Sequence, residues 1–417
     1  MTAHRDMGAK RYAYVFKKVA VLFILFLTLT GLFFLSGRSE ALRNSAIQND
    51  VRELTRKNAS FGDISQYFKN LAEKESAEYA FTVLAQASLP TNIDIHLLGH
   101  IIGDELYKQQ GLKGISICTD DFRNACSHSI VIGTLLEKGE EALSDISEIC
   151  RKAPGGSGAY TMCFHGLGHG VLAYTDYELE KAVLLCKKTG TPEYNNREYM
   201  ECVGGTAMEM IGGVHDKAVR IEKSKEYFKE NDALYPCNAD FMPVEVRAIC
   251  YLYLTPHLFE AAGGDLGNPT PRDFEGAFQL CDVIPEEDTF NRDACFGGFG
   301  KEFTVLANDR DVRNIERMNA QQLKTVYDWC TLAEHEDGIL SCINSAVKSL
   351  YWGGENDSLV AIRLCRVIDS QKRQGFCFER LINEVNFYIS DVAYRREFCT
   401  QVPTAYDIMC KQTLYVQ

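Results

Sequence analysis

The cysteines of this 417-residue chain fall into eight consecutive close couples, and no cysteine is left over. The couples are Cys118 with Cys126, Cys150 with Cys163, Cys186 with Cys202, Cys237 with Cys250, Cys281 with Cys295, Cys330 with Cys342, Cys365 with Cys377, and Cys399 with Cys410. Such an even distribution, in a chain with an export signal, is typical of a disulfide framework formed in an oxidising compartment. We predict that each cysteine bonds its nearest neighbour, although the sequence leaves crossed pairing open.

The N-terminal segment predicts a single membrane anchor. Residues 1–18 form a basic tail, and residues 19–35 form an unbroken apolar run just long enough to span a bilayer. The positive charge before this run predicts a cytoplasmic N-terminus and a periplasmic or extracellular location for the bulk of the chain. Removal of the run as a cleaved signal peptide is the alternative, because Ser39 and Ala41 match a small-x-small cleavage pattern.

A repeat is predicted over residues 63–417, after a polar stalk at residues 36–62. Segments that start at the second cysteine of each couple share small and apolar residues, and they recur every 33 to 48 residues. Their apolar residues follow helical spacing rather than strand-like alternation. A period of this size predicts two helices in each unit. We therefore expect an all-α fold, an α-solenoid of helix-pair repeats whose disulfides join the end of one unit to the start of the next.

Charge and motif content exclude several functional classes. The formal net charge is −13, and the N-terminal 40 residues are basic, so the rest of the chain is strongly acidic. An acidic surface argues against nucleic acid as a partner. The chain contains no CxxC, HExxH or GxSxG sequence, which disfavours thioredoxin-like exchange, common zinc proteases and serine hydrolases.

Five of the nine histidines occupy matching positions in the first units of the repeat. His128 and His165 lie two residues after a repeat cysteine, and His169 lies six residues after one. His96 and His100 show the same spacing in a segment that lacks the cysteine. Because residues four apart share one face of a helix, each HxxxH can present two imidazoles to one ion.

The histidine positions predict a candidate transition-metal site for zinc, copper or iron. Helices in contact are spaced by about 8 to 10 Å, so we expect one HxxxH pair together with His128, rather than all five imidazoles, around one ion. Three nitrogens with an open position match catalytic zinc sites. Asp104, Glu105 and Glu209 are the candidate carboxylates that would hydrogen-bond and orient the histidine ligands. The alternative is that duplication spread histidines that serve in packing or hydrogen bonding.

Glycines are frequent near the start of the first helix in three of the units, where each glycine costs about 1 kcal/mol relative to alanine. They are Gly166, Gly168, Gly204, Gly205, Gly297, Gly298 and Gly300. We interpret them as sites of close helix packing, and the alternative is a groove in which a ligand approaches the backbone.

Three functional classes follow from the sequence. The first is a membrane-anchored binding or scaffold protein that presents a protein or peptide ligand surface, because extended surfaces are what solenoids provide. The second is a metal-dependent enzyme that activates water or dioxygen at His128 with His165 and His169, or with His96 and His100. The third is a structural protein of the cell envelope.

Overall fold

The computed structural model of the chain describes residues 42–54, 60–89, 93–119, 122, 124–154, 156–212, 222–223, 225–265, 268–310, 315–351 and 357–415. The predicted basic tail and membrane anchor therefore lie outside the described residues. Within the described ranges, no helix combines the length and the apolar character needed to cross a bilayer.

The fold is all-α, as predicted, and the elements named in the described ranges are helices joined by turns and short 3-10 segments. The α-helices are α2 (Phe61–Lys74), α3 (Ala77–Gln86), α4 (Ile95–Gln110), α5 (Ala125–Lys138), α6 (Leu143–Cys150), α7 (Gly156–Tyr174), α8 (Leu179–Cys186), α9 (Arg197–Gly212), α11 (Val244–Tyr253), α12 (Thr255–Ala261), α13 (Pro271–Cys281), α14 (Thr289–Leu306), α15 (Ala320–Cys330), α16 (Glu336–Tyr351), α17 (Ser358–Val367), α18 (Gln371–Tyr388), α19 (Val392–Gln401) and α20 (Thr404–Tyr415).

The chain divides into two compact units. The smaller unit contains residues 42–54, which form a helix, and residues 79–89. The Tyr79 hydroxyl donates a hydrogen bond of 2.6 Å to Asp50, and Ile47 is buried. The larger unit contains residues 60–78 and the chain from residue 90 onward, and it holds every cysteine and every candidate ligand.

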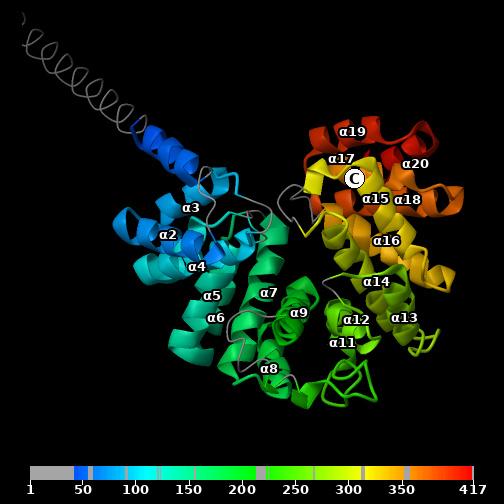
Figure 1. The fold of residues 1–417 in the computed structure, drawn as a ribbon, viewed down its shortest axis with the longest axis horizontal. Helices are drawn as coiled ribbons and strands as arrows, with labels where there is room; N and C mark the ends of the chain where they lie inside the picture. The colour runs from blue at the N-terminus through cyan, green and yellow to red at the C-terminus, as the bar shows by residue number, and fades with distance from the viewer. Residues whose placement is uncertain are drawn as a thin grey trace, which may run out of the picture. The chain divides into compact units, whose positions relative to one another are not determined.

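Within the larger unit, alternate helices form one continuous row. Helix α4 packs against α5, and contacts then follow from α5 to α7, α9, α11, α14, α16, α18 and α20 in turn (Figure 1). The intervening helices pack beside this row, as α15 does against both α16 and α17. The architecture is thus repeat-like, because each helix of the row chiefly contacts its neighbours.

All eight predicted disulfides are confirmed. Their Cα–Cα distances run from 5.4 Å to 5.8 Å, inside the range that a disulfide requires. The second cysteine of each pair lies on a helix of the row, and the first lies near the end of the preceding segment, as Cys186 does at the end of α8. Each bridge therefore ties a neighbouring helix to the row.

The packing interpretation of the glycines is confirmed where α7 crosses α9. A Cβ placed on Gly205 would lie 1.9 Å from the carbonyl oxygen of His165, and one placed on Gly168 would lie 2.0 Å from that of Cys202. Backbones at this distance exclude any side chain. Helix α14 approaches α16 equally closely, because a Cβ on Gly300 would lie 2.0 Å from the Cys342 oxygen.

A buried arginine braces the second half of the row. The Arg292 side chain donates to the carboxylates of Asp282 and Asp337, each at 2.6 Å, and to the Ile284 carbonyl at 3.1 Å. Only 4% of the side chain is exposed. Since the two aspartates come from different segments, this charge holds the junction after α13 against the start of α16.

Candidate metal centre

The five histidines come from three consecutive helices of the row and meet in one cluster. His96 and His100 lie on α4, His128 lies on α5, and His165 and His169 lie on α7. The ring centre of His128 lies 5.7 Å to 6.1 Å from the ring centre of each of the other four. His128 is therefore the shared centre of two HxxxH pairs.

His128 is buried without a hydrogen-bond partner. It is 2% exposed, and among the described residues neither ring nitrogen finds a donor or an acceptor. Burial and the nearby imidazoles hold the pKa of His128 well below its ordinary value, so the ring is neutral. A buried polar group that remains unpaired costs about 1 to 3 kcal/mol. A ligand that binds a ring nitrogen of His128 would offset this cost.

The tautomers of His96 and His100 follow from their contacts. The Nδ1 atom of His96 lies 2.6 Å from the Phe122 carbonyl oxygen, which can only accept, so this nitrogen carries the proton. The Ser129 hydroxyl donates to the His100 carbonyl at 2.9 Å and lies 3.1 Å from His100 Nδ1. Because the serine proton is already used, the serine oxygen accepts from His100 Nδ1–H. When Nδ1 carries the one proton of each ring, Nε2 carries the lone pair.

These two Nε2 atoms face each other at 3.3 Å. Two lone pairs at this separation repel unless a proton or a cation lies against both of them. Two nitrogens at adjacent corners of a tetrahedron around Zn²⁺, with Zn–N bonds of about 2.0–2.1 Å, lie about 3.3 Å apart. One ring nitrogen from each of His96, His100 and His128 falls in a group whose atoms all lie within 4.8 Å of one another. This group has the composition and approximate spacing of a three-histidine metal site.

The second HxxxH pair has a different environment. His169 Nδ1 donates to the carboxylate of Glu209 at 2.8 Å, and the Tyr177 hydroxyl lies 3.4 Å from the same carboxylate. A carboxylate that fixes the tautomer of a histidine in this way is the usual outer partner of a metal ligand. His165 instead has its Nδ1 atom 3.5 Å from the Tyr253 hydroxyl.

The three carboxylates expected around the site have different positions. Glu209 is fully buried against His169. Glu105 is buried and pairs with Lys108 at 2.7 Å, and Asp104 is exposed. The polar groups that support His96 and His100 are instead the Phe122 carbonyl and Ser129, which sequence reasoning missed. Neither had a local signal, because their role depends on how α5 packs on α4.

In comparisons with known proteins, no family model, no curated protein and no solved structure matches this chain. The functional assignment therefore depends on the chemistry of the site.

A second group of candidate ligands lies far from the cluster in sequence. It consists of Asp282, Glu334 and His335. Two of these side chains are exposed, and Asp282 already pairs with Arg292 at 2.6 Å. We therefore assign Asp282 to the ion pair with the buried Arg292 rather than to a metal site.

Proposed function

We propose that this chain is a membrane-anchored, extracytoplasmic α-solenoid that binds a transition-metal ion through His96, His100 and His128. The observation that carries the proposal is the pair of Nε2 lone pairs 3.3 Å apart, next to a buried imidazole without a partner. Imidazole ligands suit Zn²⁺, Cu²⁺ and Fe²⁺. Zn²⁺ accounts best for the spacing, because its tetrahedral site needs this nitrogen separation.

The solenoid and the location rest on separate observations. Eight disulfides with no free cysteine in the described residues support an oxidising compartment. The row of helices that contact mainly their neighbours supports a solenoid built from helix pairs. In such an array the metal serves as a local clamp, because it would link α4 directly to α5, whereas the nearby Cys118–Cys126 disulfide joins the segment after α4 to the start of α5.

The test is metal binding by the full-length oxidised chain in detergent micelles, purified without a histidine tag and stripped with a chelator. Titration with Zn²⁺ is expected to show one tight site. The His128→Leu variant should lose at least 100-fold in affinity, whereas His257→Gln, which changes a histidine outside the cluster, should retain it. Absence of a tight site in the native chain, or unchanged affinity in His128→Leu, would overturn the proposal.

A stability measurement separates ligation from packing. In the metal-free state, His128→Leu removes two unpaired buried nitrogens, so it should stabilise the fold by about 1 to 3 kcal/mol. A histidine retained for hydrogen bonding would show the opposite sign. Urea unfolding of both chains without metal decides between these roles, and it also confirms that the variant is folded.

A second candidate function, a metal-dependent enzyme, is favoured by one specific contact. Tyr253 and Glu201 line a pocket, and they lie 3.5 Å and 4.0 Å from His165 Nδ1. This pocket therefore adjoins the histidine cluster, and a substrate in it could approach the histidines on α7. Screening the zinc-, copper- and iron-loaded chain for hydrolytic and oxidative turnover tests this function. Equal turnover by native chain and His165→Gln would exclude it.

A further inference from the structure

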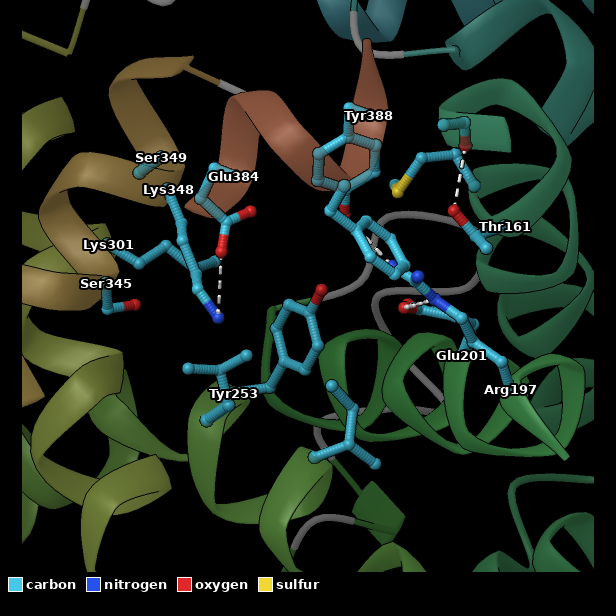
Figure 2. Close-up of a pocket in the computed structure, with 15 residues that line it drawn as sticks. Thr161, Arg197, Glu201, Tyr253, Lys301, Ser345, Lys348, Ser349, Glu384 and Tyr388 are labelled. Carbon is cyan, nitrogen blue, oxygen red and sulfur yellow. Dashed lines mark hydrogen bonds and ion pairs between the residues drawn. The ribbon is translucent and has the colours of Figure 1, made fainter. Parts of the chain in front are cut away.

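A pocket of about 410 Å³ lies among six helices of the row. Helices α7, α9 and α11 contribute one part of its lining, and α14, α16 and α18 contribute the other. The two parts meet where α18 ends against α9, because Arg197 donates to the Tyr388 hydroxyl at 3.0 Å. Figure 2 shows Tyr253 between the lysines of one part and the Arg197 side of the other. The volume suits a small organic molecule.

Basic groups outnumber acidic ones in this pocket. Its lining contains Arg197, Lys301 and Lys348 against two carboxylates, Glu201 and Glu384. This excess of positive charge stands out in a chain whose formal net charge is −13. Cations gathered in a concave site attract anions more strongly than the same charges on an open surface.

Each of the three cations has a carboxylate neighbour, but only two of these carboxylates line the pocket. Glu384 lies 3.4 Å from Lys348, and Glu201 lies 3.8 Å from Arg197. At 3.8 Å the Glu201–Arg197 pair is longer than a hydrogen bond, so this carboxylate does not occupy the donors of the Arg197 guanidinium. Lys301 is 16% exposed and pairs with Glu302, which lies outside the pocket lining, and its ammonium lies 5.2 Å from the centre of the Tyr253 ring. An ammonium over an aromatic face is held toward the pocket while it keeps its charge.

The rest of the lining is apolar and aromatic. It includes Met162, Ile249, Leu252 and Phe387. The Arg197 guanidinium lies 5.1 Å from the centre of the Phe387 ring, so the charged and apolar parts of the lining are adjacent. A second cavity of about 810 Å³ shares Arg197 and Phe387 with the pocket and provides room beyond it. A ligand that fits both features carries an anionic group joined to an apolar body.

We propose that this pocket binds an organic carboxylate attached to an aromatic or branched apolar group, with Lys301 and Arg197 as the groups that contact the carboxylate. Both cations present hydrogen-bond donors, and a charge-assisted bond to a carboxylate is about twice as strong as a neutral one. The ligand is either a free acid or the C-terminal residue of a peptide, since the adjoining cavity can accept a longer chain. This site does not use His96, His100 or His128, and although Tyr253 of its lining contacts His165, the proposed binding needs no metal.

The experiment measures binding of matched acids and amides by calorimetry to the full-length oxidised chain, in the presence of a chelator. The probes are 3-phenylpropionate, 4-methylpentanoate and N-acetyl-Ala-Ala-Phe, each compared with its neutral amide. We expect each bound acid to exceed its amide in affinity by about tenfold or more. Tighter binding of the tripeptide than of the free acids identifies a peptide C-terminus, and the reverse identifies a small acid; both outcomes support the carboxylate site.

Two lysine variants provide the matched comparison. Lys301→Met removes the pocket charge and keeps an unbranched apolar chain, and it should lower acid affinity about tenfold while leaving amide affinity unchanged. Lys324→Met is the control, because Lys324 also pairs with a neighbouring carboxylate and lies 5.2 Å from a tyrosine ring centre, but it does not line the pocket. No saturable binding of any acid, equal affinity for acids and amides, or equal effects of the two variants would overturn the proposal.

Discussion

Alanine at Gly205 is expected to force α7 and α9 apart. The added methyl carbon would lie 1.9 Å from the His165 carbonyl oxygen and 3.0 Å from the Gly168 Cα atom. Carbon and oxygen atoms in contact between backbones are separated by about 3.3 Å or more. The helices must therefore move by roughly 1.4 Å, because no side-chain rotation can relieve a clash with main-chain atoms.

The free-energy change combines two opposing effects. Alanine favours the helix by about 1 kcal/mol over glycine. Overpacking costs about 1 to 3 kcal/mol and occasionally more, and a clash between backbones belongs at the upper end of that range. We expect a net loss of about 2 kcal/mol or more in the free energy of unfolding. The movement also displaces His165, which follows α7.

The matched control is Gly276→Ala in the interior of α13. Its added Cβ would lie 3.6 Å from the nearest neighbour, the Ala262 Cβ, which is an ordinary contact. This variant should gain up to about 1 kcal/mol from helix propensity alone. Urea unfolding of the oxidised chains, monitored by circular dichroism, measures both changes. Similar free energies of unfolding for the two variants would refute the assignment of Gly205 to a helix crossing.

Three further variants test other parts of the structure. Arg292→Met should cost about 3 kcal/mol or more in urea unfolding, because it leaves two aspartates without their buried partner; a loss under 1 kcal/mol would contradict the bracing role. Replacing Cys399 and Cys410 by alanine should cost about 3 kcal/mol through the freed loop and expose the last two helices to limited proteolysis, and unchanged proteolysis would count against it. Burial lowers the pKa of His257 in the folded chain. On acidification the unfolded chain therefore protonates His257 at a higher pH than the folded chain does, so the free energy of unfolding falls as the pH drops below neutrality. The His257→Gln variant should lose less stability than the native chain between pH 7.5 and pH 5.5, and identical losses would show that this histidine does not contribute.

Much of the fold was accessible from local sequence patterns. Helix content follows from apolar spacing, and the disulfide pairs follow from the short separation of each cysteine couple, which a helix end and the next helix naturally bring together. His96 and His100 lie on the same face of a helix because they are four residues apart. The close helix packing at Gly205 was predicted by the cost of a glycine inside a helix.

Other features depend on contacts between distant segments. The sequence led us to expect that one HxxxH pair combines with His128. It did not show that the His128 ring lies centrally among all five imidazoles. That position depends on how α5 packs between α4 and α7. The support of His100 by Ser129 likewise joins two helices.

Local periodicity in the sequence by itself determined the helices, the cysteine pairs and the histidines that share a helical face, because each of these involves residues close together along the chain. The pocket was decided only by tertiary structure. Its Arg197 and Tyr388 are separated by 191 residues and meet at 3.0 Å because the row of helices brings α18 back to α9. No spacing within one helix carries that information, since the contact depends on the accumulated packing angles of every helix between them.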